Sequence, residues 1–268
     1  MKFSKLFQVK YGKKVRFSHY DPSFTAGFKK DQVEKILVKD IASIVDLEYR
    51  LYAEGERSLL IVLQAMDSAG KDGVIRHVMS GFNPQSCKVT AFKVPSAEEA
   101  AHDFLWRVHK AIPSKGEIGI FNRSHYEEVL VVRVHSLQPK KVWSRRYDEI
   151  NAFEEFLAKN GVTILKFFLH ISKDEQKKRL QARLDDTKKN WKLDPHDLKE
   201  RKYWTDYMLA YEEVLSRCST KRAPWFIIPA NRKWFRNLAI SRIIIEHLQA
   251  MEIKTPKPKF DLSNIVVK

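Results

Sequence analysis

The chain has 268 residues, of which 44% are hydrophobic, and its 49 Lys and Arg outnumber its 33 Asp and Glu to give a net charge of +16. Its longest apolar runs have only the length of single strands, which argues against a membrane-spanning helix. The two cysteines, Cys87 and Cys218, lie far apart, which excludes a disulfide framework and a cysteine-rich zinc site. The basic surplus predicts a polyanionic partner without saying which one.

The ends of the chain differ from its middle. The first residues are basic but lack the apolar stretch of a secretory signal, so we expect a soluble, cytoplasmic protein. Residues 1–30 show no sustained period and predict an N-terminal arm laid on the core. Residues 31–251 predict a single domain. Prolines after it predict an extended C-terminal tail over 252–268.

The middle of the chain alternates between strand and helix patterns. A long amphipathic helix is predicted from Asp31 to Glu54, and we expect it to pack on the sheet or on a neighbouring subunit. The predicted strands cover 58–65, 87–94, 116–122, 161–172 and 223–230. The remaining helical patterns cover 71–80, 97–110, 125–135, 147–160, 173–186, 196–217 and 233–251. Because the strands are apolar on both faces, we predict an α/β fold with a five-stranded parallel sheet covered by helices on both faces.

The first predicted strand runs directly into Ala-Met-Asp-Ser-Ala-Gly-Lys-Asp-Gly and then into a helical pattern. Strand, loop and helix in this order are typical of a phosphate-binding loop, where backbone amides and a lysine hold phosphate oxygens. The predicted phosphate-binding residues of the loop are Ala69, Gly70, Lys71, Asp72 and Gly73. The loop departs from the standard pattern at Ala65, which replaces a glycine, and at Asp72, which replaces a Ser or Thr. An ordinary polar turn is the alternative interpretation.

A second group of polar residues follows the third predicted strand. Asn122 and Arg123 stand at its carboxyl end, where parallel sheets carry ligand-binding residues, and Arg123 suits bidentate phosphate binding. Ser124 and Glu127 have the spacing of a capping box, so Glu127 either caps a helix or ligates magnesium. His125 and His135 show no carboxylate partner in the sequence and receive no chemical role.

A basic stretch follows the fourth predicted strand. Between Lys177 and Lys202 there are ten Lys or Arg against five acidic residues. Arg179 and Arg183 stand four residues apart, so both could turn toward one phosphate chain. A solvated helix face is the alternative for the whole stretch.

Several words of this sequence, in the same order, resemble the type-2 polyphosphate kinase family. They are AMDSAGKDG, GFNPQ, TAFKVPS, FLWR, GEIGIFNRSHYEEVLVVRVH, LKFFLHISKDEQKKR, NWKL, DLKER and STKRAPWFIIPANRKWF. The resemblance implies a P-loop kinase fold similar to thymidylate kinases, with a helical lid at about 185–202. It also implies Mg²⁺ as cofactor, inorganic polyphosphate and adenine nucleotides as substrates, guanine nucleotides as further candidates, and a homo-oligomer, dimer or tetramer.

The resemblance also suggests roles for individual residues. Asp67 and Lys71 match the loop carboxylate and lysine, Asn122 and Arg123 match the second motif, and Arg183 matches an arginine at the start of the lid. The expected metal ligands are Asp67, Asn122 and Glu127. Further phosphate or nucleotide contacts are expected from Trp106, Arg107, Arg133 and Arg179, and polyphosphate contacts from Lys188, Lys189 and Lys192.

Three positions point to a subclass. Many relatives have aspartate where this chain has Asn122, and a Trp-Tyr pair where it has His125 and Tyr126; this pattern resembles the subclass that phosphorylates both AMP and ADP. An ATP-dependent nucleoside or nucleotide kinase of the same fold is the second hypothesis. A basic nucleic-acid-binding protein is the third, although no recognised binding module is present. We expect neither a nucleic acid nor a membrane as partner.

Overall fold

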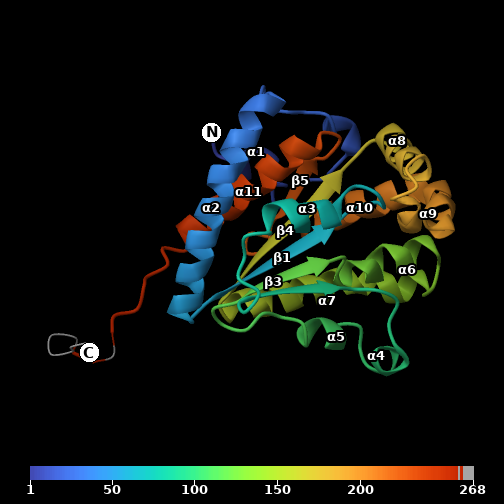
Figure 1. The fold of residues 1–268 in the computed structure, drawn as a ribbon. Helices are drawn as coiled ribbons and strands as arrows, with labels where there is room; N and C mark the ends of the chain where they lie inside the picture. The colour runs from blue at the N-terminus through green and yellow to red at the C-terminus, as the bar shows by residue number, and fades with distance from the viewer. Residues whose placement is uncertain (259, 262–268) are drawn as a thin grey trace.

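The computed structural model of the protein describes residues 1–258, 260 and 261. A parallel sheet forms its centre (Figure 1). The strands are β1 (Ser58–Gln64), β2 (Cys87–Ala91), β3 (Ile118–Asn122), β4 (Val162–His170) and β5 (Trp225–Pro229). Within the described residues they form one five-stranded sheet in the order β2-β3-β1-β4-β5, with every neighbouring pair parallel. The predicted fold class is therefore confirmed.

Helices cover both faces of this sheet. The α-helices are α1 (Phe3–Phe7), α2 (Lys30–Glu54), α3 (Lys71–Val78), α4 (Ala97–Ala101), α5 (Trp106–His109), α6 (Val131–Val134), α7 (Lys140–Lys159), α8 (Lys173–Leu184), α9 (Pro195–Glu200), α10 (Trp204–Cys218) and α11 (Lys233–Ala250). The 3₁₀ helices are η1 (Phe17–His19), η2 (His125–Val129), η3 (Asn190–Lys192) and η4 (Arg201–Tyr203).

The alternation of side chains along β1 explains why its sequence is apolar throughout. Leu59 and Ile61 join the core formed with α2, α3 and α11, whereas Leu60 and Val62 join the core formed with α7 and α10. Successive side chains of a strand point to opposite faces, so a strand between two helical layers needs apolar residues at every position.

The two ends of the chain behave differently. Phe3 and Phe7 are buried against the core, and the amide of Val9 donates to the carbonyl oxygen of Trp225 at 2.8 Å. Met251 and Ile253 still pack against the core, and after them the chain leaves it (Figure 1); its described part contains no further helix or strand. The predicted extended tail, 252–268, lies partly outside the described residues.

Several helix boundaries differ from those predicted. The pattern at 97–110 splits into α4 and α5 because His102 is extended, with φ −105° and ψ 175°. The pattern at 125–135 becomes η2 and α6, and that at 196–217 becomes α9, η4 and α10. α7 begins at Lys140 instead of 147, directly after Pro139, which can start a helix but not continue one.

The topology places a crevice above the carboxyl end of β1. The chain leaves β1 for β2 on one side of the sheet and later crosses from β3 to β4 on the other side. Ligands of open parallel sheets bind where the strand order reverses in this way. In the part of the chain that the structure describes, none of the helices combines the length and hydropathy needed to span a bilayer.

Candidate active site

The loop between β1 and α3 has the conformation of a phosphate-binding loop. Ser68 and Gly70 have positive φ angles of 63° and 106°, and α3 begins at Lys71. Among the described residues, none accepts a hydrogen bond from the amides of Gly70, Lys71, Asp72 or Gly73. Free amides at a helix N-terminus attract anions. The predicted strand, loop and helix context is therefore confirmed.

Lys71 is buried beneath this loop. Its Nζ donates to the carbonyl oxygen of Ala65 at 3.1 Å. Burial lowers the pKa of Lys71, and the nearby charge of Asp67 opposes that shift. The amine thus lies out of water, beside Asp67 and the free amides at the start of α3.

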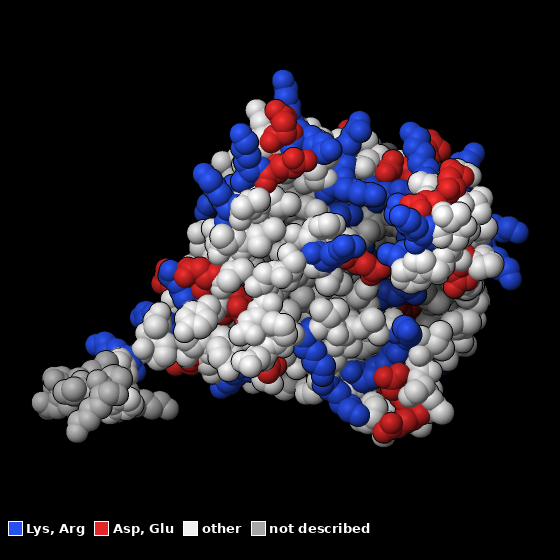
Figure 2. Space-filling view, in the orientation of Figure 1, with Lys and Arg blue, Asp and Glu red and all other residues white. Residues whose placement is uncertain are grey.

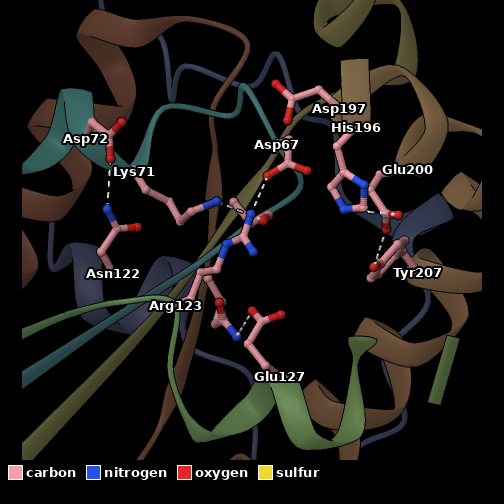
Figure 3. Close-up of polar contacts among 12 residues, drawn as sticks. Asp67, Lys71, Asp72, Asn122, Arg123, Glu127, His196, Asp197, Glu200 and Tyr207 are labelled. Atoms are coloured by element: carbon pink, nitrogen blue, oxygen red, sulfur yellow. Dashed lines mark hydrogen bonds and ion pairs between the residues drawn. The ribbon is translucent and has the colours of Figure 1, made fainter. Parts of the chain in front are cut away.

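Asp67 and Arg123 form an ion pair across the crevice (Figure 3). Arg123 Nη2 lies 2.9 Å from Asp67 Oδ1. The backbone of Arg123 has φ 62°, which is uncommon for a residue with a side chain, and its amide donates to Leu63 at 3.1 Å. Such strained conformations are concentrated at functional sites because the surrounding structure must maintain them.

Asn122 lies on the other side of Lys71 (Figure 3). Its Nδ2 donates to Asp72 Oδ1 at 2.8 Å, so the end of β3 is joined to the first turn of α3. Two of the predicted metal ligands, Asp67 and Glu127, flank Arg123, whereas Asn122 faces Asp72.

Glu127 points back to the end of β1. Its Oε1 accepts from Gln64 Nε2 at 3.1 Å. Burial raises the pKa of Glu127, and the charge of Arg123 opposes the shift. The capping box predicted from Ser124 and Glu127 is wrong: Ser124 does begin η2, but its hydroxyl accepts from the amide of Tyr126, and the Glu127 carboxylate is bound by Gln64 instead.

Two cavities meet beside these residues, and both are lined by Arg123 and Glu127. One has a volume of about 360 Å³ and is walled by Phe92, Phe104 and Leu137, with arginines at its edge. These arginines are Arg107 and Arg146. The other has a volume of about 290 Å³ and lies between the loop at Ala65–Asp67 and residues of the lid.

His196 and Glu200, from the stretch predicted as a lid, line the second cavity with Tyr207, and the sequence analysis had given these residues no role. Glu200 is buried, and it accepts from Tyr207 OH at 2.6 Å and lies 2.9 Å from His135 Nε2. Arg183 Nη1 lies 3.2 Å from Asp197 Oδ2. Burial raises the pKa of Asp197, and the charge of Asp67 adds to this shift.

Both histidines therefore have carboxylate partners, contrary to the sequence-based interpretation. His135 lies beside Glu200, and the buried His125 lies 3.1 Å from Glu154, which also accepts from Tyr126 and Lys166. These partners are far away in sequence, so spacing could not find them. The word DLKER, which contains Glu200, was the only available signal.

The three predicted lid lysines lie on the exposed surface. Lys189 pairs with Asp186, and Lys192 Nζ lies 4.9 Å from the ring of Trp191. Basic side chains gather over α8 and α9 in this view, with acidic ones among them, and again over α1 and the start of α2 (Figure 2).

Three other predicted residues are engaged elsewhere. Arg133 Nη1 donates to Tyr147 OH at 3.0 Å and to Glu213 at 2.5 Å. Trp106 stacks on His102 with ring centroids 4.1 Å apart. Neither Arg133 nor Trp106 lines the two cavities. Arg179, expected to face the phosphate chain, is instead hydrogen-bonded to the carbonyl oxygens of the loop.

The described residues contain no cluster of three or more His, Cys, Asp or Glu side chains arranged to hold a metal ion. Mg²⁺ nevertheless requires only one or two carboxylates when waters and substrate phosphates complete its shell. Asp67 and Glu127 can supply these oxygens. Gln64 Oε1, beside Glu127, is buried without a hydrogen-bond partner, which fits an ordered water of a hydrated ion.

Comparison with known proteins gives consistent results. Residues 27–256 match the sequence model of the family described as Polyphosphate kinase 2. An AMP/ADP-polyphosphate phosphotransferase from Meiothermus ruber is 47% identical over 266 residues, covering 98% of this chain and 99% of its own. An ADP-polyphosphate phosphotransferase from Rhodopseudomonas palustris is 45% identical, covering 95% of this chain and 92% of its own.

A solved structure is also similar. The crystal structure of Polyphosphate Kinase 2 from Arthrobacter aurescens TC1 has a TM-score of 0.95 and 42% sequence identity, and the match covers 98% of this chain and 94% of that one. The agreement extends over nearly the whole length of both chains.

Proposed function

This chain belongs to the polyphosphate kinase 2 family, and we propose that it transfers phosphoryl groups between inorganic polyphosphate and AMP or ADP. The observation that carries this proposal is the meeting of two cavities at Arg123 and Glu127, directly beside the phosphate loop. Phosphoryl transfer requires a donor and an acceptor in line, with cations around the moving group. A site with two compartments and a shared arginine suits that requirement.

The donor phosphate would lie on the loop. The free amides of Gly70 and Lys71 and the buried Lys71 ammonium would bind its oxygens, and Arg123, oriented by Asp67, would contact the phosphoryl group between the cavities. Arg183 would add a second cation from the lid after leaving Asp197. A nucleotide phosphate is already ionised, so the site needs no separate general base.

The acceptor nucleotide would occupy the cavity of about 360 Å³, whose volume is within the range of small-molecule sites. Phe92 and Phe104 offer apolar surface to a base, and Arg107 and Arg146, which line the same cavity, would contact the nucleotide phosphates. The support for AMP as well as ADP is the name of the Meiothermus ruber relative and the asparagine at 122.

We propose Mg²⁺ as the cofactor, held by Asp67 and Glu127. When bound, it would neutralise charge on the transferring phosphoryl group. The reaction should then stop when a chelator is added. Asn122 stays a proposed metal ligand only through a water, because its amide nitrogen donates to Asp72.

The test is incubation of the purified protein with Mg²⁺, polyphosphate and ADP, without ATP, followed by chromatography of the nucleotides. ATP should form, and AMP should give ADP first and ATP later. A nucleotide kinase that requires ATP, or a nucleic-acid-binding protein, would give no product. Product from ADP but none from AMP would contradict the subclass and leave the kinase proposal in place.

We also propose that the chain forms a homo-oligomer, a dimer or tetramer, through α2. The side chains of Val38, Tyr49 and Tyr52 are exposed on one side of this helix. Exposed apolar patches of this kind mark protein–protein interfaces. Light scattering at micromolar concentration should give a mass of two or four chains, and a single-chain mass would contradict the proposal. The expected cytoplasmic location remains a prediction.

A further inference from the structure

Arg179 of α8 is bound to the phosphate loop by its entire guanidinium group. Its Nε donates to Glu175 at 2.7 Å, and its two terminal nitrogens donate to four backbone carbonyl oxygens. These belong to Ser68 (3.2 Å), Ala69 (2.7 Å), Ala230 (2.6 Å) and Asn231 (3.2 Å). A guanidinium has five N–H donors, so no donor is left for a phosphate in this arrangement.

The contacts from α8 cover three consecutive carbonyls of the loop. Gln176 Nε2 donates to the carbonyl oxygen of Asp67 at 3.0 Å, and Arg179 takes the next two, those of Ser68 and Ala69. One helical face therefore fixes the orientation of three successive peptide planes.

The orientation of these planes decides where the loop amides point. In a trans peptide the C=O and N–H groups point in opposite directions. The carbonyl of Ala69 shares its plane with the amide of Gly70, so holding that carbonyl toward Arg179 directs the amide away from it. No described residue accepts a hydrogen bond from the Gly70 amide. It is therefore free for a phosphate oxygen.

A second arginine supports the same carbonyl. Arg236 of α11 is buried, and its Nη1 lies 3.3 Å from the Ala69 oxygen. A Cβ atom at Gly70 would lie 2.0 Å from this Nη1, and one at Gly73 would lie 3.1 Å from Nη2. The two glycines thus allow a guanidinium to pack directly on the loop.

The guanidinium groups of Arg179 and Arg236 both lie at the Ala69 carbonyl of the phosphate loop. Among the described residues, Arg236 has no carboxylate partner and binds only Asn237 Oδ1 besides the loop. Burial and the neighbouring charge of Arg179 lower the pKa of Arg236 to about 10, so it remains protonated at neutral pH. Two guanidinium groups, that of the buried Arg236 and that of the partly buried Arg179, therefore stand beside the loop, and neither lines the two cavities.

We propose that Arg179 is a positioning residue for phosphoryl transfer: by binding the carbonyls of Ser68 and Ala69 it directs the Gly70 amide toward the donor phosphate, and it does not bind the phosphate itself. This inference rests on the proposed function. It differs from a phosphate-binding role because the planar fork of the side chain is needed, and its charge alone does not suffice.

The first experiment compares Arg179→Lys with wild type and with Arg50→Lys, a control at an exposed arginine paired with Asp46 on α2. In Arg179→Lys, kcat should fall at least about tenfold, since displacing a positioned group by about 1 Å can cost on the order of a hundredfold. The slope of log KM for polyphosphate against log salt should stay unchanged. If Arg179 bound phosphate directly, the lysine variant would retain most of the activity. Loss of that phosphate contact would reduce the magnitude of the slope by roughly one.

Three results would overturn the proposal. They are a kcat within twofold of wild type, a reduced salt slope, and a lower melting temperature as the sole change. Gln176→Ala, which releases only the Asp67 carbonyl, should give a smaller loss of kcat in the same direction and serves as a milder second variant.

A second experiment does not depend on turnover. The chain has nine glycines, so labelling them with ¹⁵N gives a simple amide spectrum. Adding tripolyphosphate should shift the Gly70 signal of the wild type, and Arg179→Lys should lose most of this shift; an equal shift in both proteins would contradict the proposal. If the wild type shows the shift and Arg179→Lys loses it, but the wild type forms no ATP from polyphosphate, the proposed function fails and the positioning of the Gly70 amide by Arg179 stands.

Discussion

The phosphate loop and the stretch predicted as a lid, residues 185–202, both carry cationic side chains, yet these side chains are held in different ways. The loop is fixed by residues from distant parts of the chain, including Arg179 and Arg236, and Lys71 is buried beneath it. The lysines of the predicted lid are exposed, and Lys189 pairs with Asp186, three residues earlier. Long-range buried contacts preserve one geometry, whereas local exposed contacts allow several. We infer that the loop is built for one phosphoryl group and the lid for a polymer of variable length.

The largest expected effect is the loss of a loop residue that would touch the transferring group. Lys71→Ala and Asp67→Ala should each lower turnover at least roughly a hundredfold, the scale of losing one preorganised electrostatic contact. Lys39→Ala, at an exposed lysine of α2, is the matched control and should retain wild-type turnover. Near-normal activity in a folded Asp67→Ala protein would remove Asp67 from the mechanism.

Glu127→Gln should separate stability from activity. Because burial raises the pKa of Glu127, the folded protein binds this proton more tightly than the unfolded chain does. Glu127 therefore contributes most to stability below the ordinary glutamate pKa. This contribution is lost as pH rises through the raised pKa of the folded protein. Without metal, Glu127→Gln should melt higher than wild type at mildly alkaline pH, and this advantage should shrink at mildly acidic pH. With substrates, its turnover should fall by about tenfold as a metal-binding oxygen is lost.

Thermal melts across this pH range, together with initial rates, provide the measurement. If Glu127→Gln melts lower than wild type at alkaline pH, then the buried Glu127 carboxylate does not destabilise the folded protein there.

Asn122→Asp should have a moderate effect on the loop side of the crevice. Asn122 Nδ2 donates to Asp72 at 2.8 Å, so an aspartate would place two carboxylates together unless a cation lies between them. Because the added carboxylate would bind the cation more tightly, the variant should need several-fold less Mg²⁺ for half-maximal rate, and its ratio of AMP to ADP use should change. Magnesium titrations with each acceptor test this, and unchanged curves for both acceptors would contradict it.

The smallest expected effect belongs to the lid. Charge reversal at both Lys188 and Lys189 should raise the KM for long polyphosphate chains by a few-fold and that for short chains less, and salt should weaken the difference. Equal changes for both lengths would place the polymer elsewhere and would weaken the comparison between a fixed loop and an adaptable lid.

The sequence predicted the sheet well because the signal is local. Each strand is a short apolar run between helical patterns, and β1 to β5 appear within a few residues of the predicted ranges. The long helices α2, α8 and α11 were found for the same reason. The helical pattern at 125–135 was found as two short helices: His125–Val129 is a 3₁₀ helix, where His125 and Tyr126 make buried contacts with Glu154, and the α-helix begins only at Val131.

The residues of the candidate site also differ in whether a local sequence signal predicts them. Lys71, Gly70 and Asp72 follow from a strand, loop and helix that are adjacent in sequence, and Arg123 follows from the end of the next strand in the sheet. The pair of His135 with Glu200 joins residues 65 positions apart and had no sequence signal beyond family resemblance. The same is true of the second cavity wall that Tyr207 provides.

By itself, therefore, the sequence determined which segments become strands, where the phosphate loop lies, and which family words the chain carries, because backbone chemistry and hydrophobic periodicity act between near neighbours. Only the tertiary structure decided what the cations do. Arg179 and Arg183 stand on one helix four residues apart, yet one is bound to Ser68, 111 positions earlier, and the other to Asp197 in the lid. Side-chain partners at such separations depend on how helices pack around the sheet, which no local pattern encodes.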